Sequence, residues 1–123
     1  MLEIIAMCVR RSFVFVALLA SFFATSVHAQ GFLRQLSRTG LTQEDVNIMV
    51  AEGSQLYRSG GARVGDDAVW QNPATGAHGL AEIVAVDGNC VRTAYRFKTT
   101  RNRSMQTIEI RRCLQNGEWV LSG

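Results

Sequence analysis

Hydrophobic and polar residues follow three different patterns along this chain. Ser12 to Thr25 is an apolar run that contains no charged residue. Between residues 42 and 57 the apolar residues recur about every 3.6 positions, which is typical of a helix with one buried face. From residue 68 onward, short runs of alternating apolar and polar residues are separated by turn-forming residues. The change of period predicts a targeting segment, then a helix, then an antiparallel β-sheet.

The apolar run has the flanking residues of a secretory signal peptide. Arg10 and Arg11 precede it, and Val27 and Ala29 occupy the two positions that define a cleavage site. Cleavage after Ala29 would make Gln30 the first residue of the mature chain. A transmembrane anchor is the alternative, but the charge-free run is shorter than the roughly 20 residues that cross a bilayer. We therefore expect residues 1–29 to be a cleaved signal peptide.

The domain organisation follows from this assignment. Residues 30–40 are polar and have no clear period, so we expect a flexible lead-in before a domain that spans residues 41–123. Glu3 is unusual in a signal peptide, which makes Met7 an alternative start to Met1. Because no cysteine lies at the cleavage site, we expect no lipid anchor. The expected location is the periplasm or cell envelope, with a surface-associated or secreted form as further options.

Helix signals surround Thr42. Thr42 is a favourable N-cap residue, and Asp45 stands three positions later as its partner in a capping box. The serine and two glycines at residues 59–61 are expected to end the helix. The apolar face comprises Val46, Met49, Val50, Leu56 and Tyr57.

Five short segments have the alternation or the β-branched content of strands. They are separated by turn sequences at residues 72–76, 87–89 and 116–117, each of which contains glycine. The predicted strands cover residues 68–71, 80–86, 90–98, 106–114 and 118–121. We expect an α+β fold in which one N-terminal helix packs on a small four- or five-stranded antiparallel sheet.

The two cysteines of the expected mature chain can be paired by strand register. If residues 90–98 and 105–113 form a hairpin through the loop 99–104, one register places Cys90 opposite Cys113 and Tyr95 opposite Ile108. The same register therefore satisfies the apolar face and a cross-strand disulfide, which would contribute about 3 kcal/mol in the chain-entropy model. A metal or redox site is the alternative, but the paired spacing that such sites use is missing.

Charge is unevenly distributed along the chain. The composition is 47% hydrophobic and 19% charged, which excludes a disordered chain, and the net charge of +3 is too small to indicate nucleic-acid binding. Residues 42–89 contain seven acids and two bases, whereas residues 90–113 contain seven bases and one acid. Six bases of this second region form the candidate anion- or partner-binding set: Arg92, Arg96, Lys98, Arg101, Arg103 and Arg111. A solvated outer face is the alternative interpretation.

Candidate catalytic groups are sparse. His78 is the only histidine of the expected mature chain, and a surface position is its simplest interpretation. Asp66 and Asp67 lack the alternating spacing of a calcium-binding loop. Glycine-rich phosphate-binding motifs and the serine-hydrolase motif do not occur. We therefore expect no enzymatic activity, no cofactor and no bound metal.

The segment WQNPATGAHG at residues 70–79, followed by Cys90, Cys113 and a closing Gly-Glu-Trp, resembles a bacterial surface-antigen family. This family is related to the C-terminal domain of the rickettsial surface antigen, and the resemblance covers about residues 41–121. It implies an envelope location and a small domain without established catalysis. We interpret the motif residues as a scaffold in which the two tryptophans cover one end of the sheet: Trp70, Asn72, Pro73, Gly76, Gly79, Gly117 and Trp119.

The sequence thus predicts a non-enzymatic exported envelope domain. It is expected to bind an anionic envelope component or a protein partner through a basic strand face, with at most peripheral membrane contact and no nucleic acid. The identity of the partner and the oligomeric state are not predicted. An inhibitor or immunity protein of a periplasmic hydrolase is the alternative, because a small disulfide-bonded domain with a rigid hairpin loop suits that role.

Overall fold

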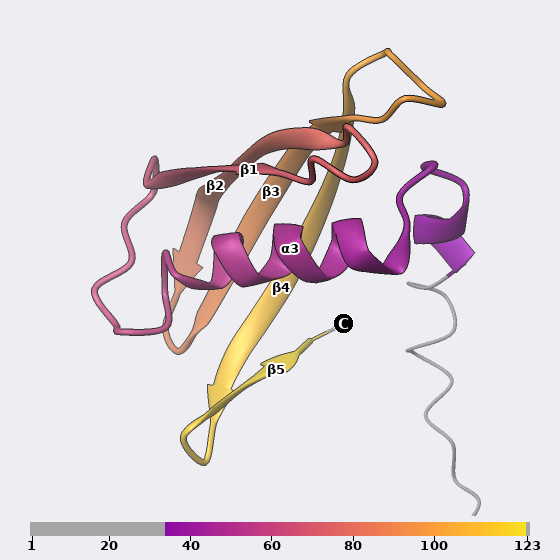
Figure 1. Cartoon of the computed structure of the whole chain (residues 1–123). Coiled ribbons are helices and arrows are strands. Elements are labelled where there is room, and N and C mark those ends of the chain that lie inside the picture. The colour runs from indigo at the N-terminus through magenta and orange to yellow at the C-terminus, as the bar shows by residue number, and fades with distance from the viewer. Residues whose placement is uncertain (1–33, 123) are drawn as a thin grey trace, which may run out of the picture. The chain divides into compact units, whose positions relative to one another are not determined.

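The fold is a five-stranded antiparallel sheet with one helix across one of its faces (Figure 1). The computed structural model describes residues 34–122, so the predicted signal peptide at residues 1–29 lies outside the described residues. The elements are α3 (Gln43–Ser54), β1 (Asp67–Gln71), β2 (His78–Asp87), β3 (Cys90–Lys98), β4 (Gln106–Gln115) and β5 (Glu118–Leu121). Each strand pairs with the next along the chain, which confirms the predicted α+β fold and its antiparallel sheet.

The helix is not N-terminal, contrary to the prediction. Residues 34–37 form a helical turn before it, and Leu36 on this turn is buried in the main core. The side-chain amide of Gln106 on β4 also donates a hydrogen bond to the Thr39 carbonyl, over 2.9 Å. Residues 34–39 therefore pack on the sheet, because the apolar side chain of Leu36 is buried in the core although the surrounding segment is polar.

The start of α3 agrees with the sequence, but its end does not. Thr42 caps the helix and forms the predicted capping box with Asp45. The helix ends at Ser54, five residues before the predicted stop at residues 59–61. The backbone N–H groups of Leu56 and Tyr57 donate to the carbonyls three residues earlier, so the chain tightens into turns before it reaches the glycines. Within residues 34–122, no helix has the length and apolar character needed to cross a membrane.

The core lies between α3 and the sheet. α3 packs against β1, β2 and β3, while β4 and β5 extend beyond it. The predicted register of β3 and β4 is confirmed, since Cys90 pairs with Cys113 and Tyr95 pairs with Ile108. Tyr95 and Ile108 both point to the helix side and are buried. The main core comprises Leu36, Met49, Trp70, Ala77, Ala81, Tyr95, Phe97, Ile108 and Ile110.

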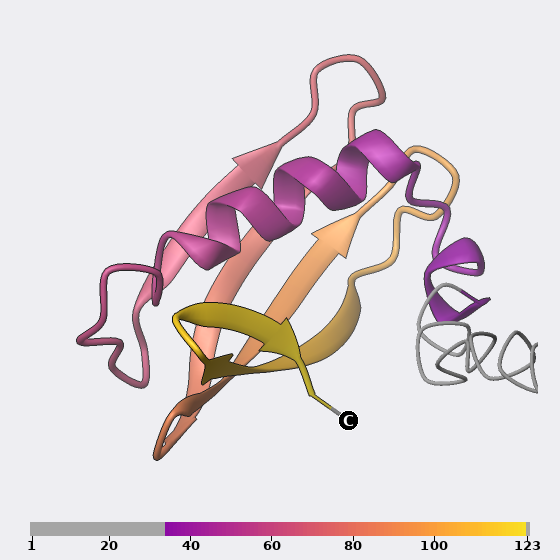
Figure 2. The same ribbon diagram turned by 90° about the horizontal axis from the view of Figure 1, so that it is seen from below.

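The two tryptophans lie on the two edge strands of the sheet, so the expectation that they cover one end is wrong. Figure 2 shows β1 and β5 at opposite edges. Trp70 on β1 is 1% exposed and packs 6.4 Å from the Phe97 ring, whereas Trp119 on β5 is half-buried and contacts the Tyr57 ring. Gly79 pairs with Trp70, and a Cβ at Gly79 would lie 2.0 Å from a carbonyl oxygen of β3. Only glycine allows β2 and β3 to approach so closely at this point.

Candidate functional site

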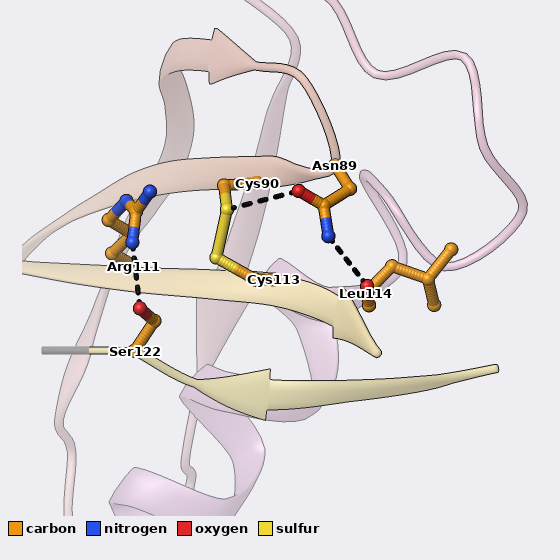
Figure 3. The surroundings of a disulfide bond; sticks show 6 residues. All are labelled: Asn89, Cys90, Arg111, Cys113, Leu114 and Ser122. Atoms are coloured by element: carbon orange, nitrogen blue, oxygen red, sulfur yellow. Dashed lines mark hydrogen bonds between the residues drawn. A yellow bond between two sulfur atoms is a disulfide. The ribbon is translucent and has the colours of Figure 1, made fainter. Parts of the chain in front are cut away.

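The predicted disulfide joins Cys90 and Cys113, where β3 begins and β4 nears its end, on the face of the sheet away from α3. Their Cα atoms are 4.0 Å apart, as in a close cross-strand pair, and both residues are buried. Figure 3 shows Asn89 beside the bond: its side-chain amide donates to the Leu114 carbonyl over 2.7 Å. The Leu114 N–H donates in return to the Asn89 carbonyl over 2.8 Å. The disulfide and Asn89 together fasten the β2–β3 turn to β4.

Three of the six candidate bases share this outer face with the disulfide, and each has a partner. Arg96 forms an ion pair with Glu82 over 2.8 Å, and Arg92 lies 3.8 Å from Glu109. Arg111 donates to the Ser122 hydroxyl over 2.7 Å (Figure 3). The strand face therefore carries a mixed charge pattern, and much of its positive charge is compensated locally.

The remaining three candidate bases gather at the other end of the β3–β4 hairpin. Lys98 is the last residue of β3, and Arg101 and Arg103 belong to the loop 99–104. Within residues 34–122, no carboxylate forms a salt bridge with any of the three. We call these residues the loop cluster. The six predicted bases are thus divided into a paired strand group and an unpaired loop group.

A cavity of about 390 Å³ lies beside the loop cluster. Its walls bring together the hairpin loop and the turn that follows β1. The lining residues are Gly76, His78, Lys98, Thr99, Thr100 and Arg103. Two permanent cations and a histidine therefore border one hollow surface, and hydroxyl groups of two threonines supply neutral hydrogen-bond donors beside them.

The loop around this cavity is held by its own hydrogen bonds. The Thr99 side chain is buried, and its hydroxyl accepts a hydrogen bond from the Asn102 N–H over 3.0 Å. The Asn102 carbonyl accepts in turn from the Thr99 N–H, and its side chain accepts from the Ser104 N–H. These bonds fix the backbone between Lys98 and Ser104, so the arginine side chains extend from an ordered base.

His78 was predicted to be a surface residue and is exposed, but it also borders the cavity. Its Nδ1 lies 3.0 Å from the Gly76 carbonyl oxygen. A carbonyl oxygen only accepts, so this contact places the proton of the neutral ring on Nδ1. Gly76 has a φ of 78°, and a Cβ there would lie 3.1 Å from the Thr100 methyl group. Glycine at this position lets the turn approach the hairpin loop and close the cavity wall.

The turn at residues 72–76 is anchored to the start of α3 through one buried carboxylate. Asp45 accepts hydrogen bonds from the Asn72 side-chain amide over 2.8 Å and from the Thr75 hydroxyl over 2.5 Å. It also accepts from the Thr42 N–H over 2.8 Å. Burial raises the pKa of the Asp45 carboxyl, but the hydrogen bonds from Thr75, Thr42 and Asn72 outweigh burial and hold this pKa below its usual value.

The other motif residues also have structural positions. Pro73 is exposed in the turn after β1. Gly117 has a φ of 80° and follows Asn116, whose φ is 50°, so both residues of the β4–β5 turn are left-handed, as a two-residue hairpin turn requires. The motif thus shapes two turns and the packing of two edge strands.

Sequence reasoning missed the partners of the strand group. Glu82 on β2 was counted with the acidic region at residues 42–89, and Glu109 was counted among the bases of β3 and β4, but a count along the chain does not show which charges face each other. Among residues 34–122, no group of three or more histidine, cysteine or acidic side chains is arranged to hold a metal ion.

Comparisons with protein-family models, with curated proteins and with solved structures find no match.

Proposed function

We propose that this chain is a non-enzymatic exported envelope protein that binds an anionic component through the loop cluster. The observation that carries the proposal is the grouping of Lys98, Arg101 and Arg103 at one hairpin loop, where they have no carboxylate partner among the described residues and where Lys98 and Arg103 line the cavity. Phosphate and carboxylate groups are the ligands that arginine side chains bind with two parallel hydrogen bonds. A phospholipid headgroup or an acidic glycan has this chemistry.

The location in the envelope is part of the proposal. It is supported by the predicted signal peptide and by the Cys90–Cys113 disulfide, a bond that persists in oxidising compartments. Membership of the surface-antigen family stays a prediction that rests on the motif at residues 70–79 and on the cysteines and tryptophan that follow it. Two motif residues, Asn72 and Gly76, belong to the turn that forms one wall of the cavity, which agrees with their interpretation as a scaffold.

The loop cluster is a better binding site than the strand group for an electrostatic reason. An anion that approaches Arg96 must compete with Glu82, which already lies 2.8 Å from the guanidinium. An anion that approaches Arg103 meets no such competitor among the described residues. Lys98 lies along the same cavity wall, so two cations can contact one ligand.

Binding to anionic vesicles tests the proposal. The purified, disulfide-bonded protein is sedimented with vesicles of phosphatidylglycerol and phosphatidylethanolamine, and separately with isolated envelope. The variant Arg101→Ala/Arg103→Ala should bind about 30-fold more weakly, because each basic residue near an anionic surface contributes about 1 kcal/mol. The matched control Arg92→Ala/Arg96→Ala removes the same charge from the strand group and should lose much less. Binding should also weaken as salt is added.

Two outcomes would contradict this assignment. If both double variants lose binding equally, general charge attracts the protein and the loop cluster is not a site. If the wild-type protein binds neither the anionic vesicles nor the envelope, the proposed function is wrong. The comparison of anionic vesicles with isolated envelope separates a lipid ligand from a glycan ligand, since a glycan-binding protein would sediment only with the envelope.

An inhibitor of a periplasmic hydrolase remains the alternative, and the ordered hairpin loop favours it. The hydrogen bonds of Thr99, Asn102 and Ser104 fix the loop backbone before any partner binds, which lowers the entropic cost of inserting it into an enzyme cleft. Inhibition of lysozyme-type hydrolases by the wild-type protein, abolished in Arg101→Ala/Arg103→Ala, would favour this function over envelope binding.

A further inference from the structure

A second hollow lies far from the loop cluster, between α3 and β5. Its volume is about 680 Å³. Val46, Val50 and Ala51 line it from α3, and Trp119 lines it from β5. The hollow forms because α3 packs on β1, β2 and β3 only. The sheet extends beyond the helix to β5, which α3 does not cover. We call this hollow the α3–β5 groove; Figure 2 shows the two elements that flank it.

The groove contains a cation with an unsatisfied donor. The Nε atom of Arg112 is buried and has no hydrogen-bond partner among the described residues. Its Nη1 atom makes only a long contact of 3.5 Å with the Trp119 carbonyl. Arg58 also lines the groove, against a single acidic residue, Glu118. A buried guanidinium N–H without a partner is costly, so the charge of Arg112 is poorly compensated. The accessible part of the same guanidinium lines the groove, where a carboxylate is the group that binds it best.

The edge of β5 offers a row of backbone groups next to the groove. The Ser122 N–H donates to the Arg111 carbonyl, which fixes the alternation of hydrogen bonds between β4 and β5. Successive residues of a strand direct their backbone groups to opposite edges, so Trp119 and Leu121 direct theirs away from β4. β5 is the last strand of the sheet, and no described strand pairs with that edge, where the Trp119 carbonyl has only its long contact with Arg112.

We propose that the α3–β5 groove binds an extended, carboxylate-bearing peptide segment of a partner protein. The segment would pair with the outer edge of β5 as a sixth strand and place an apolar side chain against Val50 and Trp119. Its carboxylate would reach Arg112. Peptide recognition by strand addition uses these two elements, a sheet edge for affinity and a neighbouring pocket for specificity. This inference does not depend on the loop cluster, which lies at the opposite end of the β3–β4 hairpin.

Titration with a synthetic peptide, followed by NMR, tests the proposal. The probe is a short peptide of alternating valine and threonine that ends in aspartate with a free carboxylate. Its control has the same sequence but ends in an amidated lysine. The probe should shift the backbone amides of Trp119 and Leu121 and the Trp119 indole N–H. The control peptide should not shift them, because it offers Arg112 no carboxylate.

Two variants test the contribution of the Arg112 charge and that of the β5 edge separately. Arg112→Met should weaken binding by about 30-fold, the effect expected when one partner of a buried charge pair is removed. Leu121→Pro removes an outward N–H without removing a hydrogen bond to β4, and should abolish binding while the protein still unfolds cooperatively. Arg101→Ala is the matched charge control and should bind the probe as the wild type does.

Three results would overturn the proposal. They are no amide shifts with the aspartate peptide, equal shifts with both peptides, and unchanged binding in both Arg112→Met and Leu121→Pro. Sedimentation of the protein alone adds a fourth, because a dimer that Leu121→Pro dissociates would identify a second copy of this chain as the occupant.

Discussion

The two halves of the sheet are stabilised in different ways. β1 to β3 lie under α3, and their inner side chains, such as Trp70 and Phe97, are almost completely buried. β4 contributes Ile108 and Ile110 to the main core, but its C-terminal part and β5 extend beyond the helix, where Trp119 is half-buried and Leu121 is 46% exposed. The covered half gains its stability from apolar packing and from one buried polar network. The uncovered half has less apolar surface to bury and is held to β3 by a disulfide.

This difference indicates which surfaces of a small domain are available for binding a ligand or a partner. Binding sites need surface that the fold does not use for its own stability. The groove beside β5 exists because α3 does not extend over β4 and β5, and the disulfide holds that half in place without filling it. A covalent bond can fasten two strands while their faces stay accessible, whereas a packed helix cannot.

Replacing each tryptophan by alanine should reveal the largest difference between the halves. Trp70→Ala should lower the free energy of unfolding by about 4 kcal/mol, because the side chain is fully buried and its loss leaves a cavity against Phe97. Trp119→Ala should cost only about 1–2 kcal/mol, since the indole is partly exposed already. Urea unfolding of both variants measures this contrast. Equal costs would mean that the two edges are equally part of one core.

Removing the disulfide should weaken the uncovered half selectively. Cys90→Ala/Cys113→Ala should lower the free energy of unfolding by about 3 kcal/mol, because a loop with a sequence separation of 23 residues is no longer closed in the unfolded chain. Hydrogen exchange of the backbone amides should accelerate first in β4 and β5, where apolar packing is too limited to compensate for the loss of the disulfide. Faster exchange in α3 and β1 before β5 would show that the disulfide supports the whole sheet evenly.

Much of the fold could be predicted because local rules and tertiary packing agree. The Thr42 cap, the order of the five strands and the β3–β4 register all follow from patterns within a few residues, although β2 begins at His78, two residues before its predicted start. The predicted helix end was wrong, because the apolar spacing continues to Tyr57 whereas the backbone tightens into turns after Ser54. Gly53 also packs so closely on Tyr95 that a Cβ there would lie 2.3 Å from the tyrosine oxygen. No pattern near residue 53 indicates that contact.

The division of the six bases into paired and unpaired groups was harder to predict, because the pairing of Arg96 depends on a bulge. The turn at residues 87–89 sets a register that would pair Glu82 with Tyr95, on the buried face. A register shift between Ile83 and Ala85 changes this, so that Glu82 pairs with Ala94 and reaches Arg96 on the outer face. The charge count along β3 and β4 could therefore not distinguish paired bases from unpaired ones.

The polar network of the covered half should contribute less than the Trp70 side chain or the disulfide. Asp45→Asn should lower the free energy of unfolding at neutral pH by about 2 kcal/mol, because the carboxylate accepts hydrogen bonds from Asn72 and Thr75 that a neutral amide accepts more weakly. An asparagine side chain also presents an NH₂ group to one of these donors. Urea unfolding of variant and wild type at a series of pH values measures the effect.

The pH dependence distinguishes a charged network from simple packing. The folded pKa of Asp45 lies below its usual value, so its contribution to stability is fully present above the unfolded pKa of about 3.9. That contribution is lost as the pH falls through the folded pKa, where both states become protonated. The wild type should therefore lose its advantage over Asp45→Asn in acid, and the two unfolding curves should converge. A difference that stays constant down to the lowest pH would mean that the shape of the side chain, and not its charge, holds the turn at residues 72–76 against α3.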